Sequence, residues 1–150
     1  MKKFILGLFL ILGAVSFTAP KFVDMAKVKN AGYVIKNERE DILTMATSDN
    51  DSAIIISFST INMSSKEISD LLKSNALRNS ENFIATLDNN RAYINEFEAQ
   101  GFYSYMIVPK KEKVKNQHTY ATYVSSKKLS KNDLSKITNA ILDEAESYIK

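Results

Sequence analysis

The chain has 150 residues, no cysteine and one histidine, with hydrophobic residues at 45% and charged residues at 25%. This length and composition are typical of a single globular domain that can bury its own core. Because cysteine is absent, disulfide staples and lipid attachment at an N-terminal cysteine are both excluded. The sequence has no internal repeat and no low-complexity tract.

The first 19 residues have the three parts of a secretory signal peptide: two lysines, an apolar run over residues 4–15, and small residues after it. The run is shorter than the roughly 20 residues of a membrane-spanning helix, so an uncleaved anchor is the weaker alternative. Small side chains favour cleavage after Ser16, or as late as Ala19. We therefore expect a signal peptide at 1–16 and one unlipidated domain at 17–150 that is periplasmic or secreted and meets the membrane only through the signal.

Removal of this signal changes the charge of the protein. The whole chain carries 20 basic and 17 acidic residues, a net charge of +3, and loss of Lys2 and Lys3 lowers the mature charge to +1. Only three of the 20 basic residues are arginines, and the rest are lysines. Guanidinium groups supply the bidentate contacts that recognise phosphates and bases, so this composition argues against nucleic acid as a partner.

The first part of the mature chain predicts a short helix and three strands. Residues 22–29 can form one helical face, and Gly32 is a typical helix end. Strands are expected over residues 32–36, 42–48 and 52–60. The turns between them are rich in Asp and Asn, which favours an antiparallel meander. The apolar stretch Ala53–Ile56 places the third strand inside the sheet.

The remaining chain predicts two helices and four strands. Ser64 and Glu67 form a capping box that begins a helix, which ends before residues 78–82. Four strands follow at 83–87, 92–98, 102–108 and 118–125, and a last helix at 131–149 has one apolar stripe (Leu134, Ile137, Ile141, Ala145, Tyr148). The order predicts an α+β fold, an antiparallel sheet of about six to seven strands covered by a middle helix and a C-terminal helix.

The second half of the mature chain carries a topological resemblance. Asn89-Asn90-Arg91-Ala92-Tyr93-Ile94 opens a long meander that follows a middle helix and is closed by a C-terminal helix. From Asn82 to Tyr148 this order and spacing resemble the exported PsbP/DcrB-like α/β domains. The resemblance implies a fold and an accessory or assembly role without catalytic residues, and it carries no site residue over to this chain.

Few residues suggest catalysis. His118 is the only histidine and lies at the edge of a predicted strand with no acid next to it in sequence, which favours a structural role. Glu96 and Glu98 are two residues apart on a strand, so their side chains project from the same face. If Tyr93 and Phe97 face the core, both glutamates face water.

Other site patterns are absent from the sequence. Asp49-Asn50-Asp51 resembles the start of a calcium loop, but the later ligand positions fall on a buried strand, so we interpret it as a turn. No motif for an activated serine or a phosphate-binding loop is present. We therefore expect no enzyme activity, no cofactor, and no catalytic, metal or cofactor-binding residue.

Two surface features remain as candidates for binding. Tyr103, Tyr105 and Ile107 are expected on one sheet face, joined by Tyr120, where they bind an envelope protein or an apolar ligand. The alternative is ordinary cross-strand packing. Lysines at 110–115 and 127–131 form two groups at opposite ends of a predicted hairpin. They are either solvated loops or weak contacts for anionic lipids or polymers.

Three functions follow in order of preference. The first is a non-catalytic exported accessory or binding domain of the cell envelope. The second is a secreted or surface factor that contacts anionic lipids or polymers through its lysine-rich loops. The third is an enzyme of unrecognised type that uses Glu96, Glu98 and His118.

Overall fold

The computed structural model describes residues 18–150, and the expected signal peptide at 1–16 lies outside this range. The helices are α1 (Met25–Asn30), α2 (Ser65–Arg78) and α3 (Lys131–Ser147). The strands are β1 (Val34–Arg39), β2 (Ile42–Ser48), β3 (Ser52–Thr60), β4 (Asn82–Asp88), β5 (Ala92–Ala99), β6 (Phe102–Pro109) and β7 (Gln117–Ser125).

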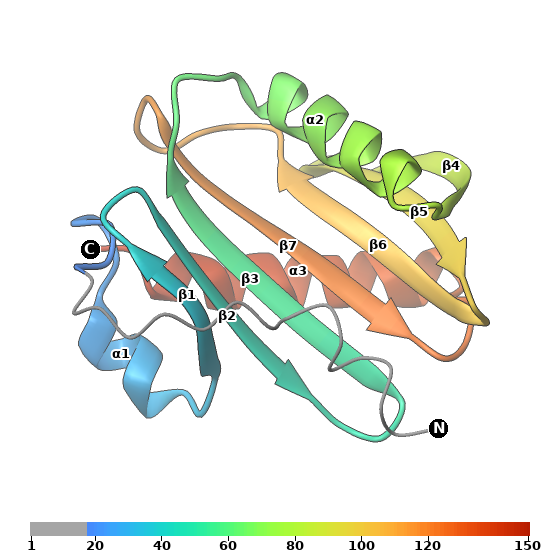
Figure 1. Cartoon of the computed structure of the whole chain (residues 1–150), viewed down its shortest axis with the longest axis horizontal. Coiled ribbons are helices and arrows are strands. Elements are labelled where there is room, and N and C mark those ends of the chain that lie inside the picture. Colours follow the sequence, from blue (N-terminus) through green and yellow to red (C-terminus); the bar gives the residue numbers. More distant parts are fainter. Residues whose placement is uncertain (1–17) are drawn as a thin grey trace.

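All seven strands form one antiparallel sheet in the order β1-β2-β3-β7-β6-β5-β4, with α2 and α3 on opposite faces (Figure 1). The predicted α+β fold, with its middle and C-terminal helices, is therefore confirmed. Two consecutive meanders are joined where β3 pairs with β7, from Ser52 opposite Ser125 to Thr60 opposite Gln117. This long-range pairing makes β3 an internal strand, as its apolar sequence predicted.

Local signals in the sequence set the helix starts. Ser64 Oγ accepts a hydrogen bond from the Glu67 amide at 3.3 Å, while the Glu67 carboxylate accepts one from the Ser64 amide at 2.7 Å. The Ser130 hydroxyl accepts from the Asp133 amide at 3.1 Å in the same way. These bonds satisfy amides that have no partner inside the helix, so the predicted starts of α2 and α3 are confirmed.

Three predicted elements had wrong boundaries. The first helix begins at Met25 rather than at residue 22, because the Asp24 side chain caps it by accepting hydrogen bonds from the Ala26 and Lys27 amides. β1 begins at Val34 and runs to Arg39, later than the predicted 32–36, because Gly32 adopts φ of 80° and still belongs to the turn after α1. α3 ends at Ser147 rather than 149. Ile149 instead forms an isolated bridge with Val23, which ties the C-terminus to the segment before α1.

The main hydrophobic core lies between α3 and the sheet. Leu134, Ile141, Leu142 and Ala145 of α3 pack in one cluster with buried side chains of five strands, β2, β3, β5, β6 and β7. The largest fully buried members from the strands are Leu43, Met45, Ile56, Phe58, Ile94, Tyr105 and Ile107. Phe22 and Val23 close one end of this cluster. The apolar stripe of α3 that the sequence predicted therefore faces the core.

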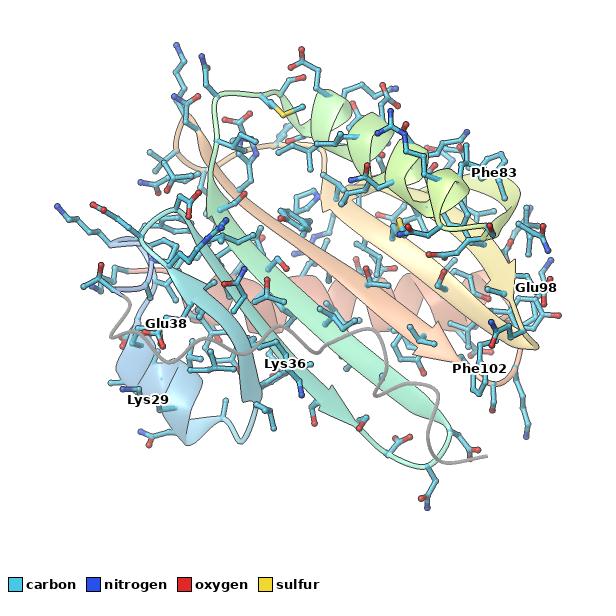
Figure 2. All side chains as sticks on the ribbon, viewed as in Figure 1. Lys29, Lys36, Glu38, Phe83, Glu98 and Phe102 are labelled. Carbon is cyan, nitrogen blue, oxygen red and sulfur yellow. The ribbon has the colours of Figure 1, made fainter. Side chains whose placement is uncertain are left out.

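The opposite face of the sheet is only half covered. α2 packs over β5 and β6, where Ser69 Oγ accepts a hydrogen bond from Asn95 Nδ2 at 3.0 Å. No helix of the described chain lies over β1, β2 and β3 on this face, which is turned toward the viewer in Figure 2. We call this surface the open half, and the strand registers place on it Thr44, Ala46, Ile55, Ser57, Tyr120 and Thr122.

Candidate functional site

The sole histidine lies on the same face as the open half, where β7 begins. His118 pairs with Ser59 across the β3–β7 ladder, and both side chains are buried, with His118 only 3% exposed. Neither His118 Nε2 nor Ser59 Oγ has a hydrogen-bond partner within the described chain. Buried polar atoms are normally paired, so these two neighbours form an unusual polar spot at the end of the sheet.

The loop between β6 and β7 supplies an acid that the sequence did not suggest. Glu112 Oε1 lies 3.8 Å from His118 Nε2, and Glu112 Oε2 accepts a hydrogen bond from the Asn116 amide at 3.1 Å. Glu112 and His118 are six residues apart in sequence, so their spacing did not predict that the two side chains lie close together. The loop reverses direction after Pro109, and an isolated bridge between Val114 and Gln117 folds it back on β7.

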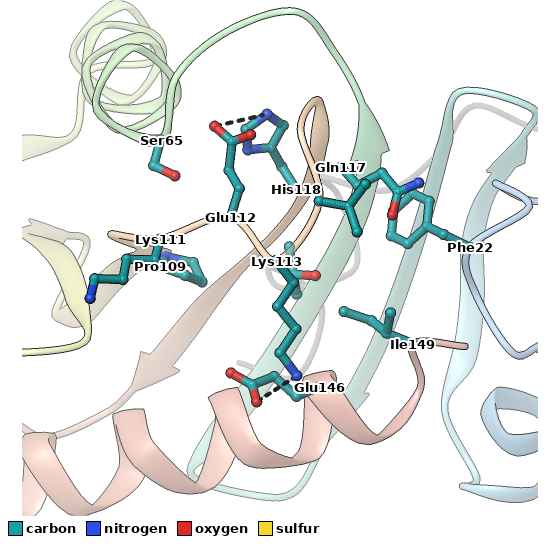
Figure 3. A pocket seen from close by; sticks show the side chains of 12 residues that line it. Phe22, Ser65, Pro109, Lys111, Glu112, Lys113, Gln117, His118, Glu146 and Ile149 are labelled. Atoms are coloured by element: carbon teal, nitrogen blue, oxygen red, sulfur yellow. Dashed lines mark ion pairs between the residues drawn. The ribbon is translucent and has the colours of Figure 1, made fainter.

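A small cavity runs along this loop from the start of α2 to the end of α3 (Figure 3). Its volume is about 50 Å³, enough for one or two small molecules of the size of water. Ser65 and His118 line one end, and Phe22, Glu146 and Ile149 line the other. At the second end, Lys113 Nζ forms an ion pair with Glu146 Oε2 at 3.0 Å.

The expectation that Glu96 and Glu98 both face water was wrong for Glu96. The two side chains do share a face, but that face is the one covered by α3, and Glu96 is 3% exposed. Lys128 Nζ lies 3.6 Å from its carboxylate. Helices cover both faces of β5. The prediction assumed that a buried Phe97 leaves the opposite face, with Glu96, in water, and this assumption does not hold.

Glu98 and His118 do not join Glu96 in one site. Glu98 lies at the far end of β5 (Figure 2), where its carboxylate accepts hydrogen bonds from Asn82 Nδ2 at 3.3 Å and the Gly101 amide at 3.1 Å. His118 projects from the opposite face of the sheet. The sheet therefore separates His118 from the two glutamates of the enzyme hypothesis.

The tyrosine-rich face is covered by α3 rather than open. Tyr105 is fully buried and stacks at 6.4 Å, centroid to centroid, on Tyr123, while Tyr103 and Tyr123 pack at the border of the core. Tyr105 Oη accepts a hydrogen bond from the Leu129 amide at 2.8 Å, and burial raises the pKa of this phenol. Tyr120, expected to join this group, projects from the other face, because it is an odd number of residues from Tyr123.

The two lysine groups lie at opposite ends of β7, as expected from the hairpin, because β6 and β7 pair antiparallel. Three of their members are ion paired: Lys110 with Asp88, Lys113 with Glu146, and Lys128 with Glu96. These carboxylates offset part of the positive charge. The loops therefore do not form one continuous basic surface.

The interpretation of Asp49-Asn50-Asp51 as a turn is confirmed. Asp49 Oδ1 accepts hydrogen bonds from the amides of Asp51 at 2.9 Å and Ser52 at 2.7 Å, which closes the connection between β2 and β3. Across residues 18–150, no group of three or more His, Cys, Asp or Glu side chains is arranged to hold a metal ion. In the same range, no helix has the length and apolar character of a membrane span.

Comparisons with known proteins gave no relative: no family model, no curated protein and no solved structure matches the chain.

Proposed function

We propose that the protein is a non-catalytic exported accessory or binding domain of the cell envelope, and that the open half of the sheet is its working surface. This proposal rests on one observation: helices cover the two faces of the sheet unevenly. α3 lies along one whole face, whereas α2 covers only the β4–β6 side of the other. A sheet face without a helix is a broad, nearly flat surface, which suits a macromolecule better than a small substrate.

The chemistry of the open half also fits binding. Its side chains are short, and mostly hydroxyl-bearing or aliphatic, with Tyr120 as the aromatic member. The hydroxyls of Thr44 and Ser57 lie 3.0 Å apart and form a hydrogen bond across β2 and β3. Ser57 itself is buried, so this bond fixes the partly exposed Thr44 on the surface. Tyrosine is enriched in protein interfaces because it combines apolar area with a polar group.

Export rests on the signal peptide at residues 1–16, whose removal leaves a domain beginning at Phe17. Mass spectrometry of the protein isolated from its own cells tests this step. A mature mass that starts at Phe17, in the periplasm or the medium, is expected. Retention of the first 16 residues in the membrane fraction would contradict export of a free domain.

Photo-crosslinking in the native envelope tests the working surface. A photoreactive phenylalanine analogue at Ile55, on the open half, is compared with the same analogue at Asn132, exposed on α3. We expect a discrete crosslinked partner from position 55 and none from position 132. Equal products at both positions, or a partner captured only from α3, would overturn the assignment of the surface.

A further inference from the structure

At the His118 end of the small cavity, the imidazole Nε2 has no hydrogen-bond partner within the described chain. The imidazole is buried, and Nε2 points toward the Glu112 carboxylate (Figure 3). The separation of 3.8 Å from Glu112 Oε1 is too long for a hydrogen bond. An imidazole nitrogen and a carboxylate oxygen that face each other across such a gap are two potential ligands of one cation.

We propose that His118 Nε2 and Glu112 Oε1 bind one divalent transition-metal ion of the zinc type, with water completing its coordination. Zinc lies about 2.0–2.1 Å from imidazole nitrogen and about 2.0–2.2 Å from carboxylate oxygen. At the observed separation of 3.8 Å, one ion can contact both atoms with an angle of about 130° between them. A contraction of about 0.4 Å gives the tetrahedral angle.

The surroundings support the ligand roles. The bond from the Asn116 amide to Glu112 Oε2 holds the carboxylate with Oε1 free to face the histidine, as outer hydrogen bonds do at metal sites. Glu112 is part of a loop and its side chain is 24% exposed, so it can make the small shift that tetrahedral geometry needs. Ser65 lines the same cavity, so its hydroxyl is available to hydrogen-bond a water on the proposed metal.

The donor set decides the class of ion. One imidazole and one carboxylate suit Zn²⁺, Cu²⁺ or Ni²⁺, whereas Ca²⁺ and Mg²⁺ prefer oxygen ligands alone. Two protein ligands are fewer than the four of a structural zinc site. The site therefore predicts reversible binding with positions open to water, not a metal that the fold requires. This binding is independent of the partner surface proposed above.

The single histidine makes the test direct, because the tag-free mature protein gives one pair of imidazole nitrogen signals in NMR. We expect one equivalent of Zn²⁺ to shift the Nε2 signal selectively and calorimetry to give a 1:1 stoichiometry. Glu112→Gln should weaken the affinity at least about tenfold while leaving the fold intact. The matched control, Glu146→Gln, removes a carboxylate of the same cavity that is already paired with Lys113, and should bind as the wild type does.

Two outcomes would contradict the proposed metal site. One is an Nε2 signal that does not change at millimolar Zn²⁺, which would mean that a water or a proton satisfies the imidazole instead. The other is equal affinity in the Glu112→Gln and wild-type proteins, or in a folded His118→Gln variant. Partner capture by the open half is measured separately and in metal-free buffer, so loss of the metal site leaves that result unaffected.

Discussion

The two faces of the sheet differ in what covers them and in what they are made of. The α3 face carries large apolar side chains under a full-length helix, together with the buried Glu96 and Tyr105. The α2 face carries apolar side chains beneath α2, among them Phe97 and Val108, and smaller side chains on the open half. Four polar strand residues of this face are buried (Ser57, Ser59, Asn95, His118). The comparison suggests that one face supplies the stability and that the other, which contributes less to it, is available for binding.

The largest expected effect compares two neighbours on β3. Ile56 is fully buried under α3, whereas Ile55 projects from the open half. Ile56→Ala should lower the free energy of unfolding by about 2–5 kcal/mol, because it removes buried methyl groups and leaves a cavity. Ile55→Ala should cost about 1 kcal/mol, since its side chain is only partly buried. Urea denaturation measures both, and equal losses would break the contrast between the faces.

A smaller effect concerns the phenol beneath α3. Tyr105→Phe keeps the ring but removes the hydroxyl that accepts the Leu129 amide, so a half-buried donor loses its partner. The expected loss of stability is about 1–3 kcal/mol. Tyr123→Phe is the control on the same face and should cost less than about 0.5 kcal/mol. If both variants unfold at the same urea concentration, the Tyr105 hydroxyl does not anchor the segment before α3.

On the other face, the start of α2 offers a single local test. Ser64→Ala removes both the capping hydroxyl and its bond to Glu67, and should cost about 1 kcal/mol. Ser74→Ala, within the same helix, should change the stability by less than about 0.5 kcal/mol. If Ser64→Ala lowers the free energy of unfolding more than Tyr105→Phe does, the α2 face contributes more to stability than the α3 face at these positions.

The smallest expected effects concern the lowered pKa values of two carboxyl groups, Glu67 and Asp49. Hydrogen bonds from the Ser64 amide and hydroxyl lower the pKa of Glu67 below 4.5, and bonds from the Asp51 amide and from Ser52 lower that of Asp49 below 3.8. A lowered folded-state pKa means that each contribution is present above the unfolded pKa and is lost as the pH falls through the folded value. NMR titration should give both low values, and Ser64→Ala should raise that of Glu67 alone.

The parts of the fold that depend on local signals could be predicted from the sequence. The Ser64–Glu67 box, the Ser130–Asp133 cap and the Asp49 turn act within a few residues, and the structure has all three. The pairing of β3 with β7 could not be predicted, because the two strands are more than 50 residues apart and no local pattern encodes their register.

The same limit explains the errors at the candidate sites. Alternation along β5 correctly placed Glu96 and Glu98 on one face, but it could not say that α3 would cover that face. Glu112 approaches His118 only because a loop folds back on β7, which no residue spacing indicates. A charged residue in a polar loop next to a lone histidine was the one available signal.

Capture of a partner by the purified mature protein tests the central claim most directly. Ala46→Lys places a charge on the open half, and Thr47→Lys places the same charge on the opposite face of the same strand. Both variants should retain the wild-type unfolding temperature within a few degrees. If the open half binds the partner, Ala46→Lys loses the envelope protein retained by the wild type, while Thr47→Lys keeps it. Retention of the same partner by both variants would contradict a binding role for the open half.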